Sequence, residues 1–166
     1  EVTSVYQERH EDVLKTTSDV KRGMEHLCKF PSVVAGRSVS SEILAGAVQG
    51  LSPLFDTTHG GFGSAPKFPS TSFLDLFLRY ADYTQDTTFL NRVTYTLGKM
   101  AWGGIYDQLG GGFHRYSTDA HWLVPHFEKM LYDNAQLARL YFATYQATGQ
   151  DFYSQIAEET LEYVLR

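Results

Sequence analysis

The sequence predicts an all-α fold in which helical hairpins surround a common axis. Apolar residues recur at the three- and four-residue spacing of amphipathic helices along most of the 166 residues. The pattern Asp-x-x-x-Gly-Gly-Phe occurs twice, at residues 56–62 and 107–113, and the two copies are 51 residues apart. A repeat of this length that includes a pair of helices is typical of helical arrays and toroids. We therefore expect the glycine-rich loops to carry the function.

Six helices are expected, and their ends follow from capping and helix-breaking residues. Ser40 is a suitable N-cap for the second helix, and Pro53 should kink or end that helix. Pro125 suits the first turn of the fifth helix, and Gly149 suits its end. The predicted helices cover residues 2–27, 40–55, 71–84, 86–100, 126–147 and 151–166.

Long loops and short turns alternate between these helices. The loops at residues 56–69 and 103–125 are rich in glycine, whereas residues 84–86 and 148–151 are plain turns. This alternation predicts that the glycine-rich loops lie at one rim and the short turns at the other. We expect the 103–125 loop to contain a short β-hairpin around residues 112–116.

The composition excludes several classes of protein. The net charge of −5, without a run of Lys or Arg, argues against a nucleic-acid partner. No apolar stretch reaches the roughly 18 to 20 residues that span a bilayer, so no membrane partner is expected. The single cysteine, Cys28, excludes an intramolecular disulfide and a cysteine-based zinc site. We expect an intracellular, cytoplasmic protein, unless a segment before residue 1 directs it to an organelle.

The densest group of reactive side chains lies in the second glycine-rich loop and at the start of the fifth helix. Abstraction and return of a proton at a sugar carbon needs a base and an acid, and His114 and His126 are suited to both roles. Arg115 or Lys129 could stabilise the enolate that forms. Glycoside hydrolysis needs two facing carboxylates instead. The carboxylates available for it are Asp107, Asp119, Glu128 and Asp133.

Structural roles compete with these functional ones. Asp56 and Asp107 could bind backbone N–H groups of their own turns. Lys129, Tyr132 and Asp133 share one face of the predicted fifth helix, where Lys129 and Asp133 could form a surface ion pair. The histidines and carboxylates of the second loop match no zinc spacing such as His-Glu-x-x-His. Neither a metal nor a cofactor is therefore expected.

Isolated histidines and large aromatic residues also have simpler interpretations. His10, His26 and His59 have no evident partners and are expected to be solvated. Trp122, Phe127 and Tyr132 lie in the loop and helix that we select for function, but such large aromatic side chains more often belong to the core than to a sugar-stacking surface.

Three segments resemble the YyaL and spermatogenesis-associated protein 20 family. They are GGFGSAPKFP at residues 60–69, GGIYDQLGGGFHRYS at 103–117 and WLVPHFEKMLYDN at 122–134. The resemblance extends over about residues 40–166. Members of this family have a thioredoxin-like domain followed by an (α/α)6 toroid. That toroid is similar to six-hairpin glycosidases and N-acylglucosamine 2-epimerases.

The resemblance implies a domain organisation and two possible functions. Residues 1–38 would be a connecting helix and linker, and residues 39–166 would form about the first half of the toroid. The rest of the toroid and the thioredoxin-like domain would be its partners. The toroid would bind a carbohydrate or polyol and isomerise it, or alternatively bind a protein client without catalysis.

Under the enzymatic interpretation, the second loop supplies most of the site. The expected catalytic residues are His114, His126, Glu128 and Lys129. The expected substrate-binding residues are Lys67, Asp107, Arg115, Tyr116, Asp119, Trp122, Tyr132 and Asp133.

Overall fold

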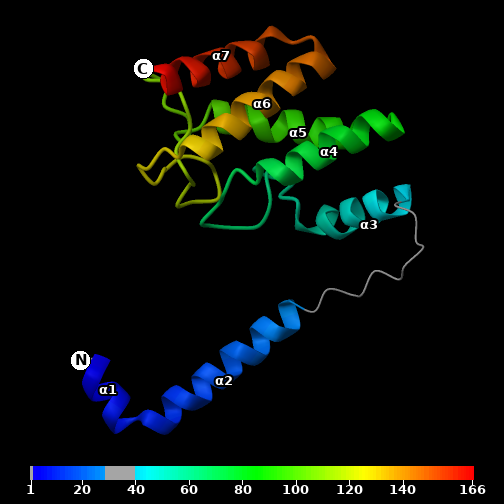
Figure 1. Ribbon diagram of the computed structural model, residues 1–166. Coiled ribbons are helices and arrows are strands. Elements are labelled where there is room, and N and C mark those ends of the chain that lie inside the picture. The colour runs from blue at the N-terminus through cyan, green and yellow to red at the C-terminus, as the bar shows by residue number, and fades with distance from the viewer. Residues whose placement is uncertain (1, 29–39) are drawn as a thin grey trace. The chain divides into compact units, whose positions relative to one another are not determined.

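The computed structural model describes residues 2–28 and 40–166 and confirms the predicted all-α fold (Figure 1). Its contacts divide the chain into two units, one before Ser40 and one from Ser40 onwards. The predicted linker at residues 29–38 lies outside the described residues. No helix in the described ranges is both long enough and apolar enough to cross a membrane.

The first unit contains two helices, whereas the sequence predicts one helix with a possible break near Thr16. Helix α1 is Val2–Glu8 and helix α2 is His10–Leu27. The break falls at Arg9, whose φ of −126° and ψ of 38° are not helical. The Arg9 guanidinium binds the carboxylate of Asp12 in the first turn of α2, at 3.0 Å.

The second unit contains helical hairpins joined by short turns. Its helices are α3 Ser41–Leu51, α4 Thr71–Thr84, α5 Thr87–Ala101, α6 Leu131–Thr148 and α7 Asp151–Leu165, with a 3-10 turn η1 at Ser52–Leu54. Pro53 lies in η1, so the second predicted helix ends at Leu51 as an α-helix, four residues earlier than its predicted end at 55. The turns that join α4 to α5 and α6 to α7 pass through Gln85 and Gly149, both in the left-handed conformation.

Helix α6 begins five residues later than the sequence predicts. The prediction rests on Pro125 as a first-turn residue, but Pro125 pairs with Ser117 as an antiparallel bridge. The backbone N–H of His126 donates to the Tyr116 carbonyl at 2.9 Å. Residues 125–130 are therefore not helical, and Met130 precedes the helix with φ −94° and ψ 132°. A long-range pairing thus overrides the local preference of proline for a helix start.

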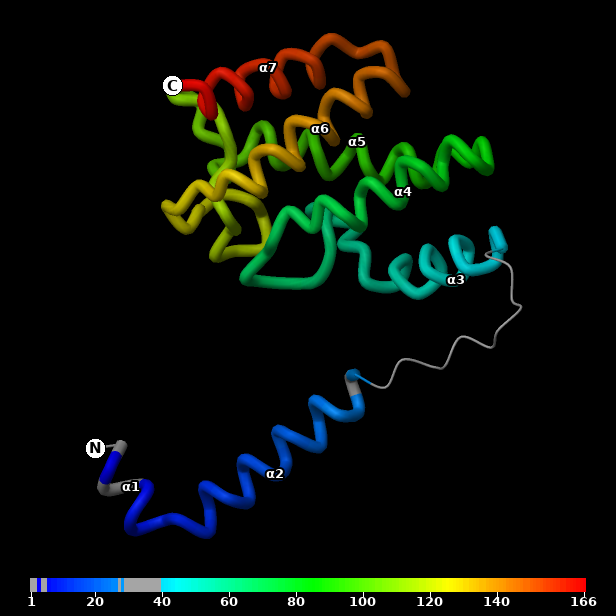
Figure 2. Tube along the Cα trace, in the orientation of Figure 1, coloured from blue at the N-terminus to red at the C-terminus, as the bar shows by residue number. Residues whose placement is uncertain are grey.

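The four helices α4 to α7 pack against one another (Figure 2). Helix α4 lies against both α5 and α6, and α7 lies along α6. Their shared core contains large side chains from every one of these helices and from the loop that precedes α6. Fully or nearly fully buried members include Leu74, Phe77, Val93, Leu97, Phe113, Trp122, Leu137, Leu140, Tyr141 and Ile156. Burial of each such side chain stabilises the fold by about 1.5–3 kcal/mol.

The short β-structure expected between residues 103 and 125 is present as isolated antiparallel bridges. Tyr106 pairs with Phe113, so the turn lies at residues 107–112, earlier than the predicted hairpin around 112–116, and Ser117 pairs with Pro125. Ser117 also pairs with Lys67 of the first loop. The two glycine-rich loops are therefore joined to each other through Ser117.

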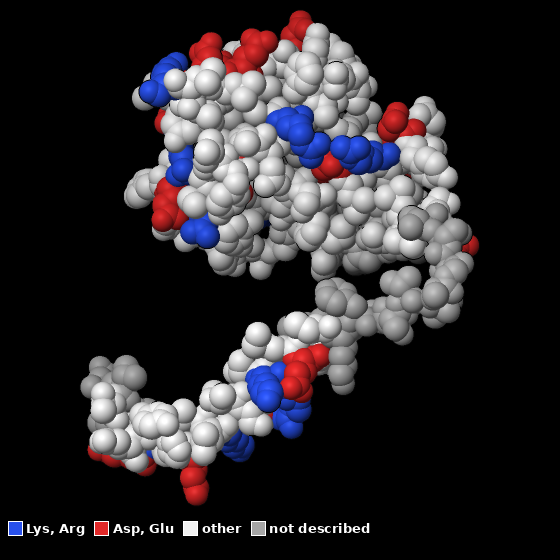
Figure 3. All heavy atoms as spheres, in the orientation of Figure 1, with Lys and Arg blue, Asp and Glu red and all other residues white. Residues whose placement is uncertain are grey.

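The charged side chains of the 40–166 unit lie in small mixed groups on the face shown in Figure 3, and most of that face is uncharged. Among the described ion pairs, one group links two helices: Asp75 of α4 binds Arg79 of the same helix at 2.9 Å and Arg139 of α6 at 3.2 Å. Exposed ion pairs of this kind contribute little stability, because water screens them.

Candidate functional site

The first copy of the repeat is a closed turn organised by Asp56. Its carboxylate Oδ1 accepts hydrogen bonds from the backbone N–H groups of Thr58 and His59, both at 2.9 Å. The Asp56 backbone exchanges bonds with Gly60 and Gly61, also at 2.9 Å. Both glycines have φ above +70°, which favours residues without a Cβ.

The second copy repeats this geometry. Asp107 Oδ1 accepts from the N–H groups of Leu109 and Gly110 at 3.0 and 2.9 Å. The Asp107 backbone exchanges bonds with Gly111 and Gly112 at 2.9 and 3.0 Å. The interpretation that both aspartates hold their own turns is therefore confirmed, and the sequence repeat is also a structural repeat.

A lysine closes each turn from outside the repeated motif. The Lys67 ammonium binds the Asp56 carboxylate and the Ala120 carbonyl, the latter at 3.2 Å. Lys129 binds Asp107 Oδ2 at 2.7 Å and the Gly111 carbonyl at 2.8 Å. The sequence predicts Lys67 as a substrate-binding residue, but its side chain is fully buried and so cannot reach a ligand. Both lysines have their charge neutralised within the loops.

The pKa values of the two aspartates follow from these contacts. Burial alone would raise the pKa of Asp56, but hydrogen bonds from Lys67 and from backbone N–H groups outweigh it and lower the pKa to about 2. The Lys129 hydrogen bond and two backbone N–H groups hold the pKa of Asp107 well below its usual range. Both carboxylates therefore stay ionised near neutral pH and are poor proton donors.

Asp119 and Trp122 organise the loop that precedes α6. The Asp119 carboxylate accepts from the N–H groups of His121 and Val124 at 2.6 Å each. Burial would raise the pKa of Asp119, but these backbone hydrogen bonds lower it overall. Trp122 is fully buried, and its indole N–H donates to the His59 carbonyl at 2.9 Å. Trp122 therefore belongs to the core and does not present its ring to a ligand. This outcome agrees with the interpretation of Trp122 as a core residue and not with its prediction as a substrate-binding residue.

Four predicted site residues do converge, on two extended segments that run antiparallel. The N–H of Arg115 donates to the Glu128 carbonyl at 2.7 Å, beside the Tyr116–His126 backbone bond. The His126 ring stacks on Tyr116 with a centroid separation of 4.7 Å and an interplanar angle of 18°. We call Arg115, Tyr116, His126 and Glu128 the rim cluster.

The charged groups of the rim cluster share one carboxylate. Glu128 Oε2 lies 3.1 Å from Arg115 Nη1 and 3.8 Å from His126 Nδ1. Hydrogen bonding to Glu128 raises the pKa of Arg115, and Tyr132 contributes in the same direction. Burial raises the pKa of Asp133, while the charge of Arg115 opposes this rise. Tyr132 and Asp133, in the first turn of α6, therefore border the rim cluster.

Two histidine nitrogens are buried without a hydrogen-bond partner among the described residues. They are the Nδ1 atoms of His126 and His114. His114 donates its backbone N–H to the Ile105 carbonyl at 2.8 Å. Unpaired buried polar atoms are uncommon in folded proteins and mark positions where a ligand or water can supply the missing partner. The described contacts do not join the His114 side chain to the rim cluster.

The single site that the sequence predicts is thus divided. Lys129 lies before α6, not on it, so it does not share a helical face with Tyr132 and Asp133. It pairs with Asp107 in place of the predicted Asp133, and its ammonium lies 4.2 Å from the centre of the Tyr163 ring. Of the four carboxylates considered for glycoside hydrolysis, Asp107 and Asp119 hold loops. Only Glu128 and Asp133 remain near the rim cluster.

Sequence reasoning missed Asn134, which is fully buried in α6. Its side-chain oxygen accepts from the Phe113 N–H at 2.6 Å, and its amide donates to the Phe113 and Met130 carbonyls at 3.0 and 2.9 Å. Asn134 thereby fixes the second loop to the start of α6. A signal was available, because residue 134 falls on the same helical face as the buried Leu137 and Tyr141.

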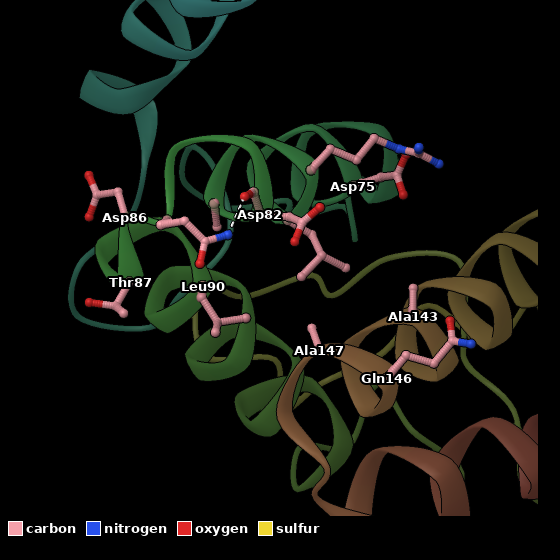
Figure 4. A pocket seen from close by; sticks show the side chains of 12 residues that line it. Asp75, Asp82, Asp86, Thr87, Leu90, Ala143, Gln146 and Ala147 are labelled. Atoms are coloured by element: carbon pink, nitrogen blue, oxygen red, sulfur yellow. Dashed lines mark hydrogen bonds and ion pairs between the residues drawn. The ribbon is translucent and has the colours of Figure 1, made fainter.

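A cleft of about 520 Å³ opens elsewhere, between α4, α5 and α6 (Figure 4). It contains none of the predicted site residues, and its polar lining includes Asp75, Asp82 and Asp86. Asp75 is neutralised by two arginines, and Asp86 caps α5 by accepting from the Thr88 N–H. The cleft therefore lacks the paired acid and base that the rim cluster supplies.

Within residues 2–28 and 40–166, no three His, Cys, Asp or Glu side chains are placed to hold one metal ion. The rim cluster offers one imidazole and one carboxylate, and this carboxylate is already paired with Arg115.

Comparison with known proteins confirms the family resemblance at the level of sequence. No protein-family model matches the chain. The chain is 48% identical over 122 residues to spermatogenesis-associated protein 20 from Homo sapiens, and 46% identical over 122 residues to that from Mus musculus. These alignments cover 71% of this chain but only 16% and 15% of the two relatives. The chain thus spans about a sixth of their length.

Solved structures confirm the toroid fold. The chain is similar to cellobiose 2-epimerase from Spirochaeta thermophila DSM 6192, with a TM-score of 0.60 and 19% identity, over 80% of this chain and 37% of that one. It is also similar to a sugar epimerase from a ruminal bacterium, with a TM-score of 0.61 and 15% identity, over 73% and 36% of the two chains. At these identities the likeness shows the fold alone.

Proposed function

Because this chain is similar in sequence to spermatogenesis-associated protein 20 and shares the toroid fold of two sugar epimerases, we propose that it binds a carbohydrate or polyol at the rim cluster and isomerises it. The observation that carries this proposal is the placement of His126 between the Tyr116 ring and the Glu128 carboxylate, with Arg115 on the same carboxylate.

These groups suit proton transfer at a carbon next to a carbonyl. The His126 imidazole takes the proton from that carbon, and the electron pair of the broken C–H bond moves onto the carbonyl oxygen as an enolate. The Arg115 guanidinium stabilises the developing negative charge. His126 then releases this proton to water, and a water molecule protonates the enolate carbon on its opposite face, which inverts the configuration there. The Glu128 carboxylate lies 3.8 Å from Nδ1 and so faces the ring that receives the proton.

Aromatic and apolar side chains near the rim cluster could hold the sugar ring. Phe127 is 86% exposed and lies between His126 and Glu128 in sequence, and Tyr132 is 50% exposed. Rings with an apolar face and a polar edge are suited to contacts with sugars, whose faces are apolar and whose edges carry hydroxyl groups.

Binding is tested by saturation-transfer NMR on the full-length protein, with cellobiose and glucose as probes. We expect His126→Gln and Phe127→Ala to weaken the transfer signal at least fivefold. His26→Gln replaces an exposed histidine of α2 and serves as the matched control, so it should leave the signal unchanged. Absence of transfer to either sugar in the unmodified protein, or equal signals in all variants, would count against the proposal.

A second candidate function is binding of an apolar protein segment. It is favoured by four exposed apolar side chains around the rim cluster: Leu123, Val124, Phe127 and Leu131, each more than half exposed. Exposed patches of this kind often mark interaction sites. The remainder of a toroid, or a client of an attached thioredoxin-like domain, could cover them. A Leu123→Ser/Leu131→Ser variant that loses binding of an unfolded client peptide but retains sugar binding would favour this function.

A further inference from the structure

Two histidines outside the rim cluster meet across the two glycine-rich loops. His59 and His121 are 62 positions apart, yet their Nδ1 atoms lie 3.3 Å from each other. The ring centroids are 4.1 Å apart and the ring planes are inclined by 77°. The sequence-based expectation that His59 is a solvated residue without a partner is therefore wrong.

The backbone beneath both rings is fixed by hydrogen bonds. His59 donates its N–H to Asp56 and accepts from the Trp122 indole, both at 2.9 Å. His121 donates its N–H to the Asp119 carboxylate at 2.6 Å. The loops thus fix the backbone of both histidines, so only rotation of the side chains remains to be restricted on binding a shared ligand.

We propose that His59 and His121 bind one transition-metal ion, such as Zn²⁺, between their Nδ1 atoms. Imidazole nitrogens bind Zn²⁺ at about 2.0–2.1 Å, and a tetrahedral angle then places two such nitrogens about 3.3–3.4 Å apart. The observed separation of 3.3 Å matches this value. Imidazole ligands also suit Ni²⁺ and Cu²⁺.

Binding requires a change of tautomer and a rotation of one ring. In the metal-free pair, one Nδ1–H donates to the other Nδ1, so one ring must move that proton to Nε2 before both lone pairs can face the ion. Both lone pairs must also point at one centre, which moves the ring centroids further apart than 4.1 Å. His121 is exposed and can make this turn.

The site has two protein ligands, and water completes the coordination, since no third suitable side chain joins them within the described ranges. An ion held in this way exchanges readily. It would clamp the first glycine-rich loop to the segment before α6. In that segment, Val124 is hydrogen-bonded through the backbone to Thr118, and His126 of the rim cluster is bonded in the same way to Tyr116. The ion would therefore stiffen one wall of the rim cluster without contacting its side chains.

The test is calorimetric titration of the full-length protein with Zn²⁺ after removal of bound metal by a chelator. We expect a Zn²⁺ site whose ion is bound at least tenfold more weakly in His59→Gln and in His121→Gln. His26→Gln should bind as the unmodified protein does, and Mg²⁺, which prefers oxygen ligands, should not compete. Because His121 is exposed, His121→Gln should fold normally, and an unchanged melting temperature without metal verifies this.

Hydrogen exchange distinguishes a clamp from adventitious binding. Zn²⁺ should slow exchange of backbone N–H groups at residues 57–61 and 119–124 at least threefold, and His121→Gln should abolish the effect. If the unmodified protein binds no Zn²⁺, or if His121→Gln binds it equally well, the pair is a hydrogen bond only and the proposal fails. Binding without slower exchange would overturn the clamp.

Discussion

Replacement of Lys67 by methionine tests whether this residue holds the fold, as its burial indicates, or binds substrate. The side chain is fully buried and its ammonium lies on the Asp56 carboxylate. Lys67→Met keeps the aliphatic stem but leaves the aspartate without its counter-charge. Removal of one partner from a buried ion pair costs about 3–5 kcal/mol.

Asp56 keeps its two backbone hydrogen bonds and is 17% exposed, so we expect the lower end of that range, about 3 kcal/mol. At about 1.4 kcal/mol for each factor of ten, the unfolded fraction rises about a hundredfold. For a domain of this size, the melting temperature should fall by roughly 10 °C.

The assay is urea unfolding followed by circular dichroism, with the double variant Asp56→Asn/Lys67→Met included. Removal of both charges should recover part of the loss, which gives a coupling energy of about 1–3 kcal/mol. Lys99→Met, which removes an exposed lysine, is the control and should change stability by less than about 0.5 kcal/mol. A Lys67→Met protein that unfolds at the same urea concentration as the parent would show that Lys67 does not hold the fold.

Three further predictions concern the loops. Gly61→Ala should destabilise by at least about 2 kcal/mol in urea unfolding, because Gly61 has φ of +76° and a Cβ there would lie 2.5 Å from the Trp122 ring; an unchanged midpoint would contradict this. Asn134→Asp should lower the free energy of unfolding by about 3 kcal/mol, because it replaces an amide donor with a charge that faces the Phe113 carbonyl. An unchanged free energy of unfolding would mean that the amide is not essential. Folding lowers the pKa of Asp56, so the stability that this carboxylate contributes is present above its unfolded pKa near 4 and is lost as the pH falls towards about 2. The pH dependence of stability in that range should therefore be weaker in Asp56→Asn. A control variant of an exposed aspartate should leave it unchanged.

Much of the fold could be predicted from the sequence, because it depends on local signals. Helical spacing locates α4, α5 and α7 to within a few residues. The repeated motif identifies two turns of the same kind, because only glycine easily adopts the positive φ that each turn needs at Gly60 and Gly111.

The arrangement of the candidate site could be predicted only in part, because it depends on long-range pairing. The start of α6 was misplaced because Pro125 pairs with Ser117 of another segment. The partners of Lys67 and Lys129 are 11 and 22 positions away, and no sequence pattern joins them. In contrast, Arg115, His126 and Glu128 were selected for their chemistry, and the structure brings these three together.

Proton transfer by His126 is the central step of the proposed reaction, and solvent exchange measures it. Cellobiose is incubated with the full-length protein in D₂O, and the proton at C2 of its reducing sugar is followed by NMR. The account predicts loss of that signal, with the rate at least about a hundredfold lower in His126→Gln and unchanged in His26→Gln. No exchange in the unmodified protein, or equally fast exchange in His126→Gln, would contradict it.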